Sequence, residues 1–399
     1  MHAGVPRRAR IGRRSPMFRR TVFNEDHEMF RDQIRRFVKA EIEPNHAEWE
    51  KDGRVSREAW RKAGENGLLC AAMPEEYGGA GADFLFSMVV MEELARVGAM
   101  GPGFSLHSDI VAPYILHYGT EAQKSEWLPK MASGEAIGAI AMTEPAAGSD
   151  VQGIKTTAVR DGDDYVINGQ KVFITNGGNC DILVLACKTD PTLGAKGTSL
   201  ILVPTDTPGF RKGPLLDKLG WKAQDTAELF FDDMRVPASN LLGTEGRGFV
   251  HLMQQLPQER LLQCVRATSA LEAALDWTVE HVMQRKAFGR TIADFQNTRF
   301  KLAEIKAQAV LLRVFTDRCL EMHMQGELDS VDAAIGKMLT SETLCRCLDD
   351  MLQMFGGYGY MWEYPIARAW ADARVGRIAG GTGEIMREII GRQLTGGRG

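Results

Sequence analysis

The order of its sequence periodicities constrains the fold of this chain more than any other feature. Apolar residues first recur at the spacing of an amphipathic helix, as in Phe30, Ile34, Phe37, Val38 and Ile42. Short apolar strands follow after about residue 140, and from about Phe249 to Leu394 helical sequence returns with few breakers. We therefore predict an α+β multidomain protein with a helical domain at 21–140, a β-barrel or sandwich at 141–240 and a four-helix bundle at 241–399.

Local signals refine this order. Asn24 and Ser56 can cap helices, and Gly78-Gly79-Ala80-Gly81 predicts a loop. In the middle region Tyr165–Thr175 predicts a hairpin that turns at Asn168-Gly169. Near the C-terminus we expect one apolar helix face, formed by Leu302, Ile305, Ala309 and Leu312. We also expect a break between two helices at Gly356-Gly357-Tyr358-Gly359.

Composition excludes several classes of protein. The 399 residues include 48 basic and 52 acidic ones, so a net charge of −4 gives no indication of nucleic-acid binding. No apolar run reaches the roughly 18 residues of a membrane span. The seven cysteines are odd in number and scattered, which fits a reducing compartment, and Cys345-Arg-Cys347 has no second ligand pair, so no metal site is expected.

The first twenty residues are unusual because they hold seven arginines and no acid. They lack leucines and an amphipathic period, so we predict a disordered basic tail at 1–20, or an upstream start codon with Met17 as the functional start. A bacterial cytoplasm is the expected location, or a mitochondrial matrix if the tail is a transit peptide.

Two motifs carry chemical information. The segment Ala141-Met-Thr-Glu-Pro-Ala-Ala-Gly-Ser-Asp150 combines hydroxyls with glycine, which suits a loop that offers donors to a planar polar ring, although a plain capped loop would read alike. Gln353-Met-Phe-Gly-Gly-Tyr-Gly-Tyr360 is followed by Glu363, Arg368 and Asp372. In order and spacing the two motifs resemble the two signatures of the acyl-CoA dehydrogenase flavoproteins, over roughly residues 23–395.

This resemblance implies FAD as the cofactor. Matching positions would place Phe173 against the flavin ring, where many relatives have tryptophan, and Arg285 on its pyrophosphate, a task that suits a guanidinium fork. The glycines of the second motif would meet the adenosine half, often in a neighbouring subunit. The full set of expected cofactor contacts is Met142, Thr143, Ser149, Phe173, Ile174, Thr175, Arg285, Gln296, Gln353, Gly356, Gly357, Thr382, Gly383 and Glu384.

The catalytic base is displaced relative to many relatives. They carry a glutamate in the loop that matches Arg377–Ile385, where this chain has Gly380. Leu256-Pro-Gln-Glu-Arg-Leu261 resembles instead the long-chain and isovaleryl members, which place the base on a helix, so Glu259 is the predicted base. Pro257 would break or kink that helix and turn Glu259 inward, where burial should raise its pKa. Without the resemblance Glu259 would read as an exposed helix residue.

Further positions are expected to bind the substrate. The N–H of Gly380 would bond the thioester carbonyl, and Arg260 would face the CoA portion. The resemblance implies that Gly101–His107 lines the pocket floor, and the small residues Pro102 and Gly103 within it suggest an open floor, hence a long-chain or branched acyl-CoA. The predicted substrate contacts are Ser149, Pro257, Gln258, Arg260, Gly380, Gly381 and Arg392.

Three functions remain open at this stage. The first is an acyl-CoA dehydrogenase that passes electrons to an electron-transfer flavoprotein. The others are a flavin monooxygenase or oxidase on the same fold, and a non-catalytic relative that binds acyl-CoA, although a buried carboxylate would bring nothing to a mere binder. The resemblance also implies a homotetramer.

Overall fold

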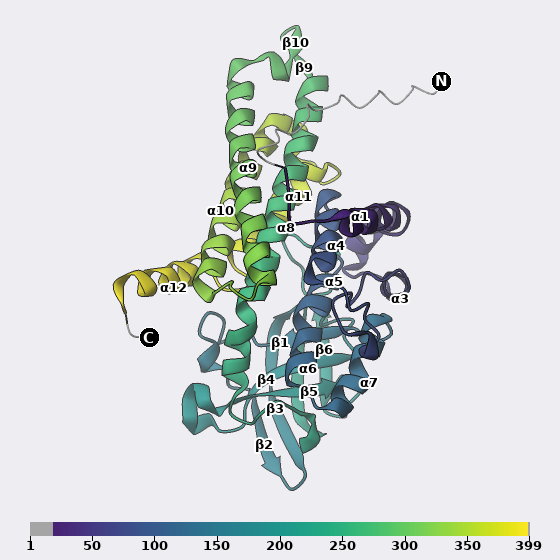
Figure 1. The fold of residues 1–399 in the computed structure, drawn as a ribbon, viewed down its shortest axis with the longest axis vertical. Coiled ribbons are helices and arrows are strands. Elements are labelled where there is room, and N and C mark those ends of the chain that lie inside the picture. Colours follow the sequence, from purple (N-terminus) through teal and green to yellow (C-terminus); the bar gives the residue numbers. More distant parts are fainter. Residues whose placement is uncertain (1–18, 398–399) are drawn as a thin grey trace.

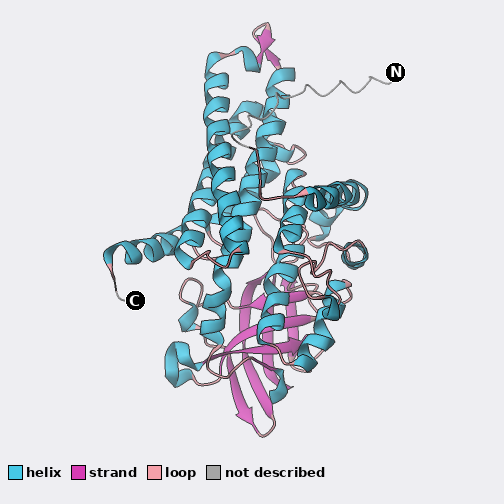
Figure 2. Cartoon of the chain, in the orientation of Figure 1, coloured by secondary structure: helices cyan, strands magenta, loops and turns pink. Residues whose placement is uncertain are grey.

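A computed structural model describes residues 19–397, and the strands lie at one end of the molecule, below the long C-terminal helices (Figures 1 and 2). The N-terminal helices are α1 Glu25–Phe37, α2 Glu43–Asp52, α3 Arg57–Glu65, α4 Phe84–Arg96, α5 Phe104–Leu106, α6 Ala112–Tyr118 and α7 Glu121–Ala132. Two π-helical turns, Val38–Ile42 and His107–Val111, join α1 to α2 and α5 to α6.

Both predicted N-caps are confirmed. The Asn24 side chain accepts the His27 N–H at 3.0 Å while His27 Nδ1 accepts the Asn24 N–H at 3.1 Å, which is a capping box. Ser56 Oγ accepts the Ala59 N–H at 3.3 Å. These contacts satisfy backbone donors that a helix start leaves unpaired. The predicted loop is also confirmed, because the short 3₁₀ turn Glu75–Tyr77 ends before Gly78 and residues 78–81 belong to no helix or strand.

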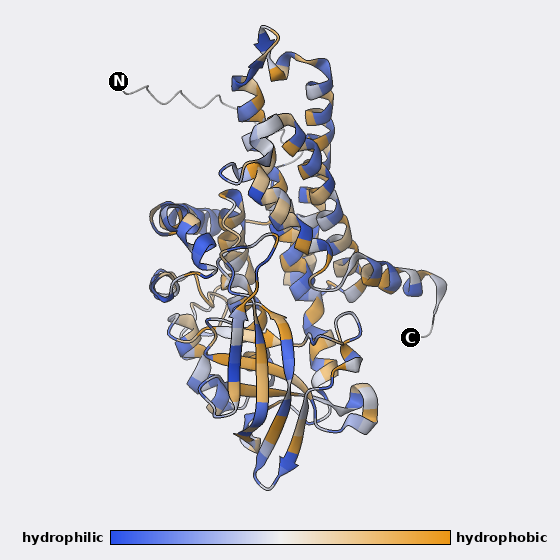
Figure 3. Ribbon diagram, turned by 180° about the vertical axis from the view of Figure 1, so that it is seen from behind, coloured by the Kyte–Doolittle hydropathy of each residue, from blue (hydrophilic) through white to orange (hydrophobic). Residues whose placement is uncertain are grey.

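The middle region forms an eight-stranded sheet in the order β6-β7-β3-β2-β4-β5-β8, with β1 parallel to β4. Strands β4 and β5 are almost wholly buried, which explains their continuous apolar sequences. Figure 3 shows this apolar character along the middle of the sheet. The strands are β1 Gly138–Ala141, β2 Thr157–Asp161, β3 Asp164–Ile174, β4 Ile182–Lys188, β5 Thr198–Pro204, β6 Phe210–Leu215, β7 Ala227–Pro237 and β8 Leu241–Leu242.

The hairpin predicted at Asn168-Gly169 is wrong. Strand β3 runs through both residues, and its register against β7 shifts between Ile167 and Gly169, which marks a bulge. A Cβ on Gly169 would lie 2.5 Å from Thr156 Oγ1, so glycine serves close strand contact here rather than a turn. The actual turn lies at Gly162, between β2 and β3.

The C-terminal region contains α8 Gly248–Gln284, α9 Gln296–Met324, α10 Ser330–Phe355, α11 Pro365–Ala373 and α12 Gly383–Thr395, with the small hairpin β9 Lys286–Ala287 and β10 Arg290–Thr291 between α8 and α9. Helices α8 to α11 share one core, to which they contribute Leu271, Leu312, Leu348 and Ile366. This sharing confirms the predicted four-helix bundle. The predicted apolar stripe of α9 enters that core, with Leu302 at its edge.

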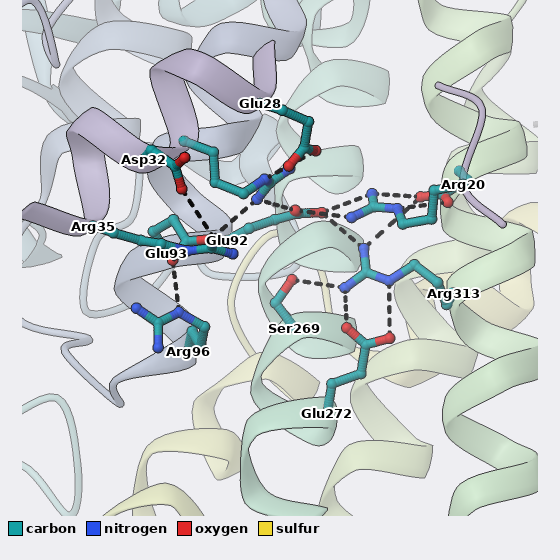
Figure 4. A network of polar contacts seen from close by, with 12 residues as sticks. Arg20, Glu28, Asp32, Arg35, Glu92, Glu93, Arg96, Ser269, Glu272 and Arg313 are labelled. Carbon is teal, nitrogen blue, oxygen red and sulfur yellow. Dashed lines mark hydrogen bonds and ion pairs between the residues drawn. The ribbon is translucent and has the colours of Figure 1, made fainter. Parts of the chain in front are cut away.

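A buried ionic network joins α1, α4 and α9, and it includes Arg20 (Figure 4). The Glu92 carboxylate lies 2.8 Å from a guanidinium nitrogen of each of Arg20, Arg31 and Arg313. Arg20 therefore belongs to the folded body, and the predicted disordered tail at 1–20 is wrong at that residue. The remainder of that prediction, with Met17, falls on residues 1–18, which lie outside the described residues.

Candidate active site

Glu259 lies on α8 and is buried, with 7% of its surface exposed. Its Oε1 accepts a hydrogen bond from the hydroxyl of Tyr114, on α6, at 3.0 Å. Tyr114 is itself fully buried. The structure thus places the predicted base in the interior and gives it one well-defined hydrogen-bond donor.

The inward direction of Glu259 comes from helix periodicity. Gln255, Glu259 and Leu262 are buried on α8 and follow the spacing of one helix face. Helix α8 runs through Pro257 without interruption, so the break considered from the sequence does not occur. The adjacent Gln258 donates to the Asp109 carbonyl at 2.6 Å, which fixes α8 against the π-helical turn before α6.

Burial raises the pKa of Glu259 to about 7, and this effect exceeds the opposing hydrogen bond from Tyr114 and the charge of Arg260. Burial also raises the pKa of Tyr114 well above its usual value, so the phenol stays protonated and remains a donor. A carboxylate poised near neutral pH can accept a proton and release it again.

Arg260 is buried rather than exposed, and its Nη1 donates to Ser330 Oγ at 3.2 Å. Its Nε has no partner among the described residues. Nearby, the buried Lys337 donates from Nζ to the Gly381 carbonyl and so anchors the loop that carries Gly380. Burial and the charge of Arg260 lower the pKa of Lys337 to about 8.

Gly380 lies next to α8, close to the helical turn that carries Glu259. A Cβ at this position would meet Gln263 Cγ at 3.8 Å, and Gln263 is one helical turn after Glu259. The structure therefore brings the predicted base close to the loop that carries Gly380. Gly380 is exposed with φ +67°, so its backbone is accessible.

A buried ion pair holds the loop of the first motif, and one of its two partners lies outside the motif. Lys171 Nζ donates to Glu144 Oε1 at 2.8 Å and to the Met142 carbonyl at 2.9 Å. Glu144 also accepts the backbone N–H groups of Lys155 and Thr156. These bonds leave Met142 and Thr143 partly accessible and Ser149 exposed.

Phe173 presents an aromatic ring to the outside. It is 66% exposed and has φ +61°, beside a second register shift between β3 and β7. Positive φ is strained for an aromatic residue and points to a functional position. Ile174 is buried and Thr175 partly so. An exposed ring beside a loop with hydroxyl groups fits a flat, polar cofactor.

A second group of predicted contacts lies at the far end of α8. An open hollow of about 850 Å³ is lined by Arg285, Gln353, Gly356 and Gly357. The Arg285 guanidinium lies over the Tyr358 ring, 5.4 Å from its centre. Gln296 is exposed at the first turn of α9 and lies beside the lining residues Asn297 and Thr298.

The remaining predicted residues lie on or before α12, which extends away from the body of the chain (Figure 1). Thr382 caps this helix by accepting the Ile385 N–H at 3.3 Å, Gly383 is buried and Glu384 is exposed. Arg392 is exposed and pairs with Glu388 at 2.5 Å. Within one chain, Arg392 is not brought to the Glu259 site.

Two small cavities, of about 20 and 40 Å³, flank α8 and share Arg266, Ala95 and Met100 in their linings. Pro102 lines the smaller one, as expected for a pocket floor. Gly103 does not open it, because a Cβ there would lie 1.9 Å from Asn176 Oδ1. Gly103 therefore serves tight packing against the turn that follows β3.

The described residues were also searched for metal sites and for membrane-spanning helices. Over residues 19–397, no cluster of three or more side chains suited to hold a metal ion is found. None of the helices in this part of the chain combines the length and apolar character needed to cross a bilayer.

Sequence comparison identifies all three regions. Residues 24–135, 139–234 and 246–395 match the N-terminal, middle and C-terminal domains of acyl-CoA dehydrogenase. The mitochondrial long-chain specific acyl-CoA dehydrogenase of Sus scrofa is 51% identical over 377 residues, which are 94% of this chain and 88% of that protein.

Solved structures agree with this result. An acyl-CoA dehydrogenase from Geobacillus kaustophilus is 50% identical with a TM-score of 0.93, covering 94% of this chain and 100% of that one. Butyryl-CoA dehydrogenase from Megasphaera elsdenii is 36% identical with a TM-score of 0.88, covering 94% of this chain and 99% of that one. The chain therefore belongs to the acyl-CoA dehydrogenase family.

Proposed function

We propose that this enzyme is FAD-dependent and introduces an α,β double bond into long-chain or branched acyl-CoA thioesters, with Glu259 as the base. The observation that carries the proposal is a buried carboxylate, with a pKa raised to about 7, beside the Gly380 loop. The likeness to a long-chain specific relative supports the substrate class.

In this proposal the Glu259 carboxylate removes the proton alpha to the thioester carbonyl. The Gly380 N–H donates to that carbonyl and stabilises the negative charge that develops on it, an effect worth about 3 kcal/mol for a well-placed donor. A bound flavin, held by Met142, Thr143 and Phe173, would supply an acceptor for the hydride of the beta carbon. Tyr114 keeps Glu259 oriented, and the surrounding apolar residues exclude water.

The proposed cofactor contacts fall into two separate groups. Met142, Thr143, Ser149 and Phe173–Thr175 would hold the flavin ring. Arg285 and the second motif would hold the phosphates and adenosine. Along α8, Arg285 lies about 40 Å from Glu259. One cofactor near Glu259 would therefore draw its second group of contacts from another copy of the chain, which supports an assembly of at least two copies, in agreement with the proposed homotetramer.

Anaerobic titration with acyl-CoAs of graded length tests the proposal. We expect the flavin absorbance to bleach with long or branched chains, and a preference for four-carbon chains would contradict the substrate class. We propose an electron-transfer flavoprotein as the acceptor. Rapid reoxidation of the bleached protein by air would instead indicate an oxidase or monooxygenase, and a colourless protein would indicate a non-catalytic relative.

The proposed base predicts a specific pH dependence. Because Glu259 must be ionised to accept a proton, kcat/KM should rise with pH and level off above about 7. A profile measured between pH 5 and 9 under saturating electron acceptor would show this acid limb. A limb centred near the usual glutamate value would mean that another group acts as the base.

Substitution Tyr114→Phe should shift this limb to higher pH. The phenol donates to Glu259 Oε1 at 3.0 Å and stabilises the ionised carboxylate, so removing it should raise the pKa of Glu259 further. The same pH profile measures the shift. Tyr118→Phe is the matched control, since its hydroxyl contacts Gln254 and Gln255 rather than Glu259, and it should leave the limb in place.

A further inference from the structure

The smaller of the two cavities beside α8 contains polar groups that an unsubstituted acyl chain would not need. It lies between α4, residues 102–109 and α8. Ser87, Asp109 and Arg266 line it among apolar side chains. Such groups are costly to enclose unless something pairs with them.

These groups are incompletely paired within the chain. Ser87 is 4% exposed, and its hydroxyl lies near enough to the Asp109 carboxyl to lower the pKa of that group, but Oγ forms no hydrogen bond of ordinary geometry among the described residues. Arg266 donates to Ser105 Oγ at 2.9 Å, and its guanidinium lies over the Trp221 ring, 4.9 Å from the ring centre, but across residues 19–397 no ion pair between it and Asp109 is found. Each nevertheless senses the charge of the other, and burial raises the pKa of Asp109 to about 7 and lowers that of Arg266 to about 10.

The position of Arg266 relates the cavity to the proposed base. It is seven residues after Glu259 on α8, two turns along the same face. The rise of the helix separates them by about 10 Å, the length of roughly eight carbons of an extended chain. A chain held at Glu259 and running along α8 would bring its far end between Arg266 and Asp109.

We propose that this cavity selects acyl chains that carry a hydroxyl group roughly eight carbons beyond the carbon that loses its proton. The inference rests on the proposed function and adds the substrate class. A hydroxyl can accept from the guanidinium, which only donates, and can donate to the carboxylate, which only accepts. A methyl end would leave both groups unpaired, and a carboxylate end would face the like charge of Asp109.

The test compares 10-hydroxydecanoyl-CoA with decanoyl-CoA. With the holoenzyme, kcat/KM should favour the hydroxylated substrate by about tenfold. In Arg266→Leu the preference should be lost or reversed, while Arg318→Leu, an exposed arginine on α9, should keep it. A preference of the wild type for decanoyl-CoA, with the same ratio in Arg266→Leu, would overturn the inference and mean that water occupies the cavity.

Folding is checked by flavin absorbance and thermal unfolding of each variant. If Arg266→Leu does not fold, Asp109→Leu decides the matter through the same ratio. Anaerobic bleaching separates the two proposals: if neither substrate bleaches the wild-type flavin, the proposed function fails. If both bleach it and the variants leave the ratio unchanged, only the inference about the hydroxyl group fails.

Discussion

The variant Glu259→Gln should reduce flavin bleaching by a saturating acyl-CoA by about 10²–10⁴-fold, while it still folds and binds FAD. Glutamine fills the same space and can still accept the Tyr114 hydroxyl proton, so packing around α6 and α8 should be preserved. What it lacks is a carboxylate that can take the alpha proton. Anaerobic stopped-flow absorbance measures the bleaching rate directly.

The matched control for this variant lies on the same helix. Glu280→Gln makes the same chemical change on the exposed side of α8, where the carboxylate accepts a hydrogen bond from Gln284, and its rate should equal that of the wild type. Flavin content measured for both variants separates a lost base from a lost cofactor. If Glu259→Gln bleached at a tenth of the wild-type rate or faster, the base would have to be another residue.

Periodicity made the architecture accessible from sequence. Helix caps, helix faces and strand runs depend on residues a few positions apart, so the cap at Asn24 and the apolar stripe of α9 could be predicted and are found. The burial of Glu259 became predictable only through the family resemblance, because its helix also offers exposed positions of similar composition.

Local sequence patterns do not predict contacts between residues that are far apart in the sequence. Tyr114 and Glu259 are 145 residues apart, and no local pattern marks the tyrosine as a donor to the base. The Lys171–Glu144 pair is similar, since a lysine in a strand ordinarily predicts an exposed position. The hairpin predicted at Asn168-Gly169 was wrong for a related reason. The close approach of Thr156, just before β2, explains the glycine, rather than local turn geometry.

The second large effect concerns stability: Glu92→Gln should destabilise the protein by about 3–5 kcal/mol, because it leaves three arginines around a neutral side chain. Burial alone would raise the pKa of Glu92, but the charges of Arg313 and Arg20 outweigh it and lower the pKa to about 2. Thermal unfolding of the FAD-loaded protein would show the loss as a lowered midpoint.

Glu28→Gln is the control that isolates burial as the cause. Glu28 also contacts Arg31, at 3.3 Å, but its side chain is 57% exposed whereas that of Glu92 is 7% exposed, so its loss should cost less than about 1 kcal/mol.

Because the pKa of Glu92 is depressed on folding, its contribution to stability is complete above the unfolded value near 4.5 and is lost as pH falls toward about 2. The difference between wild type and Glu92→Gln should therefore be constant near neutral pH and shrink below pH 4.5. A difference that stayed constant down to pH 3, or equal losses in both variants, would show that the ionic network in Figure 4 does not hold α1, α4 and α9 together through the charge of Glu92.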